Sequence, residues 1–130
     1  MIALDTNVWV RYVTNDDPVQ ARRAMSILAA ADEVFLPKTV LLELEWVLRA
    51  VYDLPREAIL KSMLQILGLS MVQAENEEQV ARALDWFRGG IDFADALHMA
   101  GSSNAEAFVT FDEVLIRKGK RLKLPVKRQA

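Results

Sequence analysis

Short apolar runs alternate with longer segments of helical periodicity along the chain, and this alternation restricts the fold more than any other feature. Strands that alternate with helices form βαβ units, and these build a parallel sheet with helices on both faces. The sequence therefore predicts an α/β fold with a parallel sheet. The expected strands are Met1–Leu4, which is expected to be buried, Val34–Leu36 and Ala107–Thr110, with shorter candidates at Met71–Val72 and Leu124–Lys127.

Helix caps and helix breakers divide the intervening segments into a series of expected helices. Thr6 is the expected N-cap of a helix over residues 7–13, and Thr39 is the expected N-cap of a helix through Tyr52. Pro18 suits the first turn of the helix between them. Three later helices are expected, from Pro55 to Leu67, from Glu75 to Arg88 and from Asp92 to Ser102.

The composition fits one globular domain without covalent crosslinks. The chain has 130 residues, 52% of them hydrophobic, which predicts a single domain over residues 1–130 with a real core. It contains no cysteine, so disulfides and cysteine–zinc sites are excluded. The sequence has no apolar run of ~18 residues and no basic signal-peptide start. We therefore expect a soluble, cytoplasmic protein that does not contact a membrane.

Positive charge is concentrated after residue 116. This segment holds seven bases and no acid, although the chain as a whole has a net charge of −2. Two interpretations remain open: the bases bind a phosphate backbone, or they belong to a solvated surface strand and turn. The seven are Arg117, Lys118, Lys120, Arg121, Lys123, Lys127 and Arg128.

Two acids come shortly after expected strands. Asp5 directly follows the first strand, and Asp112 follows the strand that ends at Thr110. In open parallel sheets, ligands bind in the crevice beyond the carboxyl ends of the strands. We therefore expect both carboxylates at that edge of the sheet.

Glu43 and Glu45 lie in the same expected helix but have different neighbours at helical spacing. The residues three, four and seven positions from Glu43 are apolar, so Glu43 is expected to point inward. Glu45 has Arg49 four residues later, which predicts an ordinary surface ion pair. A carboxylate that points inward costs several kcal/mol unless another group compensates its charge.

Asp92 and Asp95 open the last expected helix. Asp92 is well placed as its N-cap, whereas Asp95 lies one turn further on and shares a face with His98. Acids that converge without cations repel one another and raise each other's pKa. A bound divalent cation resolves that conflict, and an oxygen-only ligand set favours Mg²⁺ or Mn²⁺ over zinc.

Four stretches that carry these acids occur in a characteristic order and cover nearly the whole chain. They are Ile2–Asn7, Leu42-Glu43, Asp92–Ala100 and Val109–Asp112. In this order and spacing the chain resembles the PIN-domain family, and within it the VapC-type toxins of bacterial toxin–antitoxin systems.

The resemblance implies a three-layer α/β/α sandwich with a central parallel sheet, whose acids bind Mg²⁺ or Mn²⁺ and cut RNA. Asp5 and Asp95 match the metal ligands, and Glu43, Asp112 and Asp92 are further candidates for the same site. The implied catalytic set is Asp5, Glu43, Asp95 and Asp112, supported by the polar side chains of Asn7 and Thr110.

The resemblance also implies partners and a reaction. The expected activity is an endoribonuclease reaction in which a metal-activated water hydrolyses the phosphodiester. The expected partners are the RNA substrate, a cognate antitoxin protein and a second copy of the chain in a symmetric homodimer. Arg11 and Lys38 are candidate bases near the acids.

Two other functions compete with this one. A haloacid-dehalogenase-like phosphohydrolase also starts with a strand and an acid, but it needs a second Asp where this chain has Asn7. A catalytically inert PIN-like binding module would be expected to have lost one of the four acids.

The remaining notable side chains are expected to pack. His98 is interpreted as a packed, hydrogen-bonded helix residue. The three tryptophans are interpreted as core residues or parts of an interface, and the methionines as core filler. They are Trp9, Trp46, Trp86, Met25, Met63, Met71 and Met99.

Overall fold

Two compact units make up the chain, an N-terminal unit of residues 1–77 and a C-terminal unit of residues 78–130. The computed structural model describes the backbone of residues 1–128 and the side chains of residues 1–126. Both units contain parallel strands, but the strands form two separate sheets, one in each unit.

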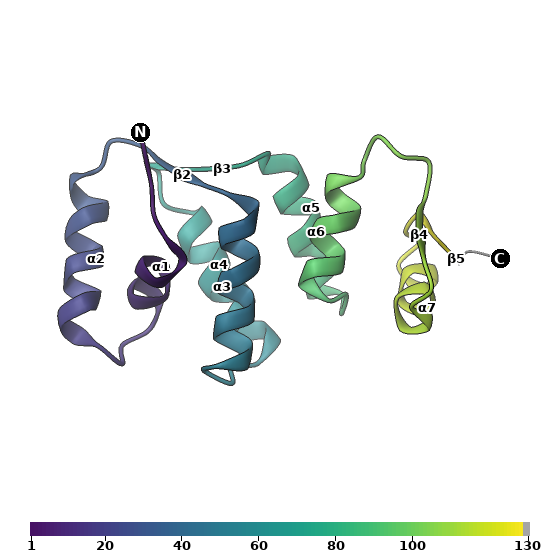
Figure 1. Ribbon diagram of the computed structural model, residues 1–130, viewed down its shortest axis with the longest axis horizontal. Helices are drawn as coiled ribbons and strands as arrows, with labels where there is room; N and C mark the ends of the chain where they lie inside the picture. Colours follow the sequence, from purple (N-terminus) through teal and green to yellow (C-terminus); the bar gives the residue numbers. More distant parts are fainter. Residues whose placement is uncertain (129–130) are drawn as a thin grey trace. The chain divides into compact units, whose positions relative to one another are not determined.

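The N-terminal unit is built on a three-stranded parallel sheet in the order β1-β2-β3. Ile2 pairs with Val34, and Val34 pairs with Val72. Figure 1 shows β2 and β3 along one side of the unit's helices. In chain order the elements are β1 (Ile2–Ala3), α1 (Thr6–Val13), α2 (Pro18–Ala30), β2 (Val34–Leu36), α3 (Lys38–Ala50), α4 (Arg56–Leu67) and β3 (Val72–Ala74).

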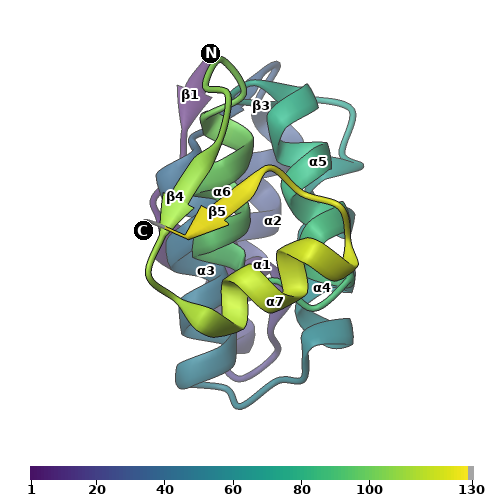
Figure 2. The same ribbon diagram turned by 90° about the vertical axis from the view of Figure 1, so that its right-hand side faces the viewer.

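The C-terminal unit pairs two further parallel strands, with Phe108 opposite Val126. Figure 2 shows this pair of strands next to the last helix. The close approach depends on Gly119, because a Cβ at that position would lie 2.8 Å from the Val126 side chain. The elements are α5 (Glu77–Arg88), α6 (Phe93–Gly101), β4 (Phe108–Thr110), α7 (Glu113–Arg121) and β5 (Val126–Arg128).

One stripe of α3 supplies much of the core of the N-terminal unit. Leu41, Leu44 and Leu48 are fully buried and follow the spacing of one helix face. Full burial of each such leucine stabilises the fold by about 1.5–3 kcal/mol. The opposite, solvent-facing side of α3 carries Trp46, which is 53% exposed.

The structure confirms the α/β class, the parallel strand pairing and the order of the predicted elements. It contradicts the prediction that Met1–Leu4 is wholly buried. Ile2 and Ala3 are exposed and only Leu4 is buried, because β1 is an edge strand that pairs with β2 alone.

Two predicted caps are wrong by one or two residues. Asp5, not Thr6, is the N-cap of α1, because the Asp5 backbone is extended and its carboxylate accepts a hydrogen bond from the Thr6 N–H at 2.8 Å. Pro37, not Thr39, is the N-cap of α3, which has no side-chain cap. The prediction for Pro18 is confirmed.

Helix α7 was not predicted, since its sequence is strongly basic and contains Gly119. The signals for it are present but short. Asp112 caps the helix, Glu113 lies in the first turn, and the bases lie in the last turn, where a helix dipole favours them. The basic segment is therefore part helix and part strand: its first four bases lie in α7, Lys123 follows the helix, and Lys127 and Arg128 lie in β5.

Two packing predictions are also wrong. Met25 is 57% exposed, because the buried stripe of α2 runs through Ala24 and Leu28, and His98 is exposed on α6. The exposure of Trp46 excludes core packing and leaves its interpretation as part of an interface open. Trp9, Met63 and Met99 are buried as predicted, whereas Trp86 and Met71 are half-buried.

In the part of the chain that the structure describes, no helix combines the length and the hydrophobicity needed to cross a bilayer.

Candidate active site

Asp5 lies between β1 and α1 and directly precedes the first residue of the helix. Its carboxylate caps α1 through the Thr6 N–H, and its side chain remains exposed. Thr6 is buried, and its hydroxyl has no hydrogen-bond partner within residues 1–126. The first predicted acid therefore lies beside an unpartnered hydroxyl oxygen.

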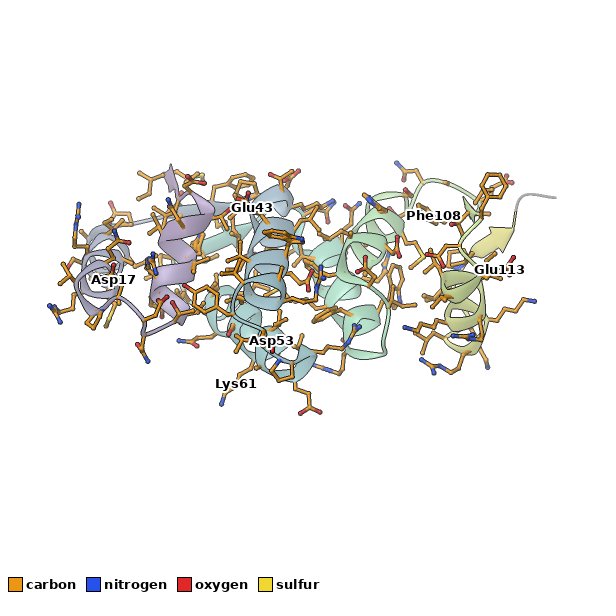
Figure 3. The ribbon with its side chains drawn as sticks, turned by 60° about the horizontal axis from the view of Figure 1, so that its bottom comes forward. Asp17, Glu43, Asp53, Lys61, Phe108 and Glu113 are labelled. Atoms are coloured by element: carbon orange, nitrogen blue, oxygen red, sulfur yellow. The ribbon has the colours of Figure 1, made fainter. Side chains whose placement is uncertain are left out.

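Glu43 lies on α3 and is exposed, so the prediction that it points into the core is wrong (Figure 3). The apolar residues at helical spacing from Glu43 do not form the core. Val47 and Val51 instead line a surface pocket, and Glu43 lines the same pocket. An exposed carboxylate at the rim of a pocket is solvated, which removes the cost of burying it.

The buried acid of α3 is Glu45, which lies on the leucine stripe and is 2% exposed. Its carboxylate receives hydrogen bonds from Arg49, from Nε at 2.8 Å and from Nη2 at 3.3 Å. The predicted ion pair is confirmed, but its acid is buried and not at the surface. Glu45 is thus a structural residue.

The pocket brings Asp5 and Glu43 together within the N-terminal unit and has a volume of about 420 Å³. Asn7, a predicted supporting residue, lines it as well, as do Arg11 and Tyr52. The apolar part of its lining comes from Val10, Val47 and Val51. The pocket therefore combines two acids, one amide and one guanidinium.

Arg11 is held in place by a polar network at the end of α1. Its Nε donates to Gln20 at 2.8 Å, and its Nη1 donates to Asp16 at 3.0 Å and to the Tyr52 hydroxyl at 3.4 Å. The Tyr52 hydroxyl donates to Asp16 at 2.8 Å. The hydrogen bond from Tyr52 is the largest cause that lowers the pKa of Asp16, followed by contributions from Thr14 and Arg11.

Asp95 forms the centre of an acidic cluster in the C-terminal unit. Its backbone N–H donates to Asp92 at 3.3 Å, so Asp92 is the N-cap of α6, as predicted. Asp95 is half-buried, and this burial is the main cause that raises its pKa. The charges of Asp92 and Asp112 raise it further, whereas His98 lowers it.

Asp112 caps α7 with two hydrogen bonds. Its carboxylate accepts from the Val114 N–H at 2.9 Å and from the Leu115 N–H at 3.1 Å. The hydroxyl of Thr110, the other predicted supporting residue, accepts from the Asp112 N–H at 3.0 Å. Thr110 thus fixes the backbone from which this carboxylate projects.

The structure thus groups the predicted acids into an N-terminal pair, Asp5 and Glu43, and a C-terminal cluster, Asp92, Asp95 and Asp112. Within residues 1–126, no three histidine or acidic side chains are close enough to one another to hold a metal ion by themselves. The donor set nevertheless suits Mg²⁺ or Mn²⁺, because it consists of carboxylate oxygens and the unpartnered Thr6 hydroxyl.

Two of the predicted phosphate-binding bases have structural partners. Lys118 Nζ donates to the Gly90 carbonyl at 2.8 Å, and Arg121 Nη2 donates to the Gly89 carbonyl at 2.9 Å. Arg117, Lys120 and Lys123 are exposed. The side chains of Lys127 and Arg128 lie outside the described residues.

Sequence reasoning missed Tyr52 and Asp16. Tyr52 was expected only as the end of a helix, and no role was expected for Asp16. No local signal links two residues that lie 36 positions apart. Arg11 and Lys38 were both candidate bases. Arg11 lines the pocket, whereas the backbone N–H of Lys38 donates to Glu75 at 3.0 Å.

The family model described as "PIN domain" matches residues 2–121 of this chain. A crystal structure of Mycobacterium tuberculosis VapC20, described as a sarcin-ricin loop cleaving toxin, is similar in fold. It is 18% identical, with a TM-score of 0.47, and the match covers 92% of this chain and 95% of VapC20. No curated protein matches the sequence.

Proposed function

We propose, from the premise that this chain belongs to the PIN-domain family, that it is a metal-dependent endoribonuclease and the toxin of a toxin–antitoxin module. The family is one of nucleases, and its fold is an α/β sandwich. This membership also leaves no support for the haloacid-dehalogenase-like alternative.

One observation carries the proposal: within residues 1–126, no lysine or arginine forms an ion pair with any of the five acids of the predicted site. Ion pairs in the described residues join Arg11 to Asp16, Arg49 to Glu45 and Arg88 to Asp85. None of them involves the predicted acids, and the cluster around Asp95 raises the pKa of that carboxyl. Carboxylates that lack cationic partners and repel one another are suited to a divalent cation.

The proposed roles divide between the two groups of acids. Asp5 in the N-terminal unit and Asp95 in the C-terminal unit are the proposed ligands of Mg²⁺ or Mn²⁺, and Glu43, Asp112 and Asp92 are proposed as further ligands or as residues that orient the attacking water. When bound, the cation lowers the pKa of a water and polarises the phosphodiester. Asn7 and Thr110 would hold the carboxylates in position. In-line attack on the phosphorus would leave a 5′-phosphate and a 3′-hydroxyl.

The direct test is RNA cleavage by Asp5→Asn and Asp95→Asn in Mg²⁺ or Mn²⁺. Each variant is expected to lose on the order of 10²–10⁴ in rate, the range found for positioned catalytic groups. Asp32→Asn and Glu106→Gln remove an exposed acid from each unit and serve as controls. If both site variants are folded and cleave RNA at the wild-type rate, the assignment is wrong.

Calorimetric titration with Mn²⁺ separates this proposal from an inert binding module. The wild-type chain is expected to bind Mn²⁺, and Asp5→Asn and Asp95→Asn to bind it more weakly. A chain that binds no Mn²⁺ in any form would favour the inert module.

The toxin role has its own test. Induced expression is expected to arrest growth, and Asp95→Asn to abolish the arrest. Co-expression with the product of an adjacent small reading frame that encodes a DNA-binding antitoxin should relieve the arrest. As further parts of the proposal, the protein is cytoplasmic and forms a symmetric homodimer, and light scattering after size exclusion would test the dimer.

A further inference from the structure

A row of three hollows lies along α1 and α2, all within the N-terminal unit. The first is the pocket that contains Asp5 and Glu43. The second shares Asn7 and Arg11 with the first. The third shares Arg23 and Ile27 with the second. Shared lining residues make the three hollows neighbours, and we refer to this row of hollows as the track.

The charge along this track changes from acidic to basic. Two acids and one arginine line the first hollow. Arg11 and Arg23 line the second, Arg22 and Arg23 line the third, and neither of these hollows is lined by an acid. The two acids at the start of α2 are engaged, since Asp16 binds Arg11 and Asp17 accepts from the Gln20 N–H at 3.1 Å.

Arg22 and Arg23 project from an exposed helix surface, and Val19 and Ile27, which line the third hollow, are 59% and 40% exposed. Such a surface offers positive charge for phosphates and apolar contacts for sugars and bases. A polyanionic substrate is repelled by the acids it must reach, so bases beside them are needed to hold it.

We propose that single-stranded RNA lies along α1 and α2, with its backbone phosphates bound by Arg22 and Arg23 and with Arg11 at the junction with the acidic pocket. The proposal rests on the proposed nuclease function, because the direction of the track matters only if the acidic pocket is where RNA is cut. It adds a location for the substrate and names the side chains that bind it.

Binding can be measured without cleavage, by fluorescence anisotropy of a labelled single-stranded RNA of mixed sequence in EDTA at several salt concentrations. Each phosphate contact to a single strand contributes about 0.7 to the slope of log K against log salt. The variant Arg22→Gln/Arg23→Gln is therefore expected to reduce the slope by about 1.4. Arg22→Lys/Arg23→Lys keeps the charges and is expected to keep the slope.

The matched control removes two positive charges elsewhere. Lys61 on α4 points into solvent (Figure 3), and Arg82 on α5 is exposed. Lys61→Gln/Arg82→Gln is expected to keep the wild-type slope. All these positions are exposed helix residues of similar helix propensity, so the variants should fold, which circular dichroism would verify. An equal slope for the wild type and Arg22→Gln/Arg23→Gln overturns the proposal.

Two further readouts separate this proposal from its alternatives. In the cleavage assay, Arg22→Gln/Arg23→Gln is expected to raise KM and leave kcat unchanged. If Asp5→Asn still cleaves RNA while Arg22→Gln/Arg23→Gln shows the expected reduction in the slope of log K against log salt, the catalytic assignment fails and the RNA-binding proposal is supported. If the arginine variant loses binding to poly-glutamate but not to RNA, α2 is a docking surface for an acidic protein segment and the proposal fails.

Discussion

Asp16 in the N-terminal unit and Asp95 in the C-terminal unit have pKa values that move in opposite directions. The pKa of Asp16 is lowered, first by the Tyr52 hydroxyl and then by Thr14 and Arg11. The pKa of Asp95 is raised, first by burial and then by the neighbouring Asp92 and Asp112. The side chains are chemically identical, so their surroundings alone account for the difference.

The comparison separates a structural acid from a functional candidate. Asp16 has hydrogen-bond donors that satisfy its charge, and so it needs no ligand. Asp95 is half-buried beside Asp92 and Asp112, and the contribution of His98 does not offset their effect, so the net shift of its pKa is upward. A cation would stabilise the ionised carboxylate of Asp95 and would add little stabilisation to that of Asp16, which already has hydrogen-bond donors.

The largest expected difference between the two aspartates is in metal affinity. Asp95→Asn should weaken Mn²⁺ binding by at least about 10–100-fold, the loss seen even when a residue that only supports a metal ligand is removed. Asp16→Asn should leave the affinity nearly unchanged. Calorimetry on both purified variants measures this, and an equal loss for the two would refute the distinction.

The buried carboxylate of Glu45 can be deprived of its hydrogen-bond donors by replacing Arg49. Arg49→Met keeps the aliphatic stem but removes both hydrogen bonds to the buried Glu45 carboxylate. We expect the free energy of unfolding to fall by about 2 kcal/mol, since a buried charged group is left without its donor. Urea denaturation measures the change. Arg88→Met, which breaks an exposed pair in the C-terminal unit, is the control and should cost little.

Two variants separate the role of Asp112 as a helix cap from the role of its negative charge. Asp112→Ala removes both hydrogen bonds to α7 and should destabilise the protein by about 1 kcal/mol. Asp112→Asn keeps a capping oxygen and should be nearly as stable as the wild type. Thermal melts measure stability, and RNA cleavage measures function. If Asp112→Asn cleaves at the wild-type rate, the Asp112 charge has no role in catalysis.

The dependence of stability on pH should differ in sign between the two aspartates in metal-free buffer. Ionised Asp95 is disfavoured in the folded state, so Asp95→Asn should raise Tm above the raised pKa. This gain should vanish as pH falls below 3.8, the ordinary value, where Asp95 is protonated in both states. A Tm that is lower for Asp95→Asn at pH 7 would show that the carboxylate is stabilised after all.

Asp16 should have the smallest effect on the pH dependence of stability, with a sign opposite to that of Asp95. Its ionised form is favoured by folding, so its contribution is present above 3.8 and is lost as pH falls through the lowered folded pKa. Tyr52→Phe removes the largest cause and should bring the pKa of Asp16 back toward its ordinary value. NMR titration of the Asp16 carboxyl measures this directly, and an unchanged titration would mean that Arg11 and Thr14 suffice.

Much of the fold was predictable because its signals are local. Apolar runs, prolines and the Asp92 cap act over a few residues, and the structure places β2, α2, α4 and α6 close to where they were expected. Helix α7 was missed because its buried residues are only Leu115, Ile116 and Gly119, and bases occupy most of its second half. Few apolar positions leave little periodicity to detect.

The sequence by itself determined the α/β alternation, the family likeness and the acids that follow β1 and β4. The tertiary structure decided which acid of α3 is buried, since helical spacing identifies a stripe but not what packs against it. In α3, Glu45 lies on the buried stripe and pairs with Arg49, whereas Glu43 is exposed and lines the pocket. It also decided the link between Arg11, Asp16 and Tyr52, because a hydrogen bond between distant residues exists only once packing has brought them together.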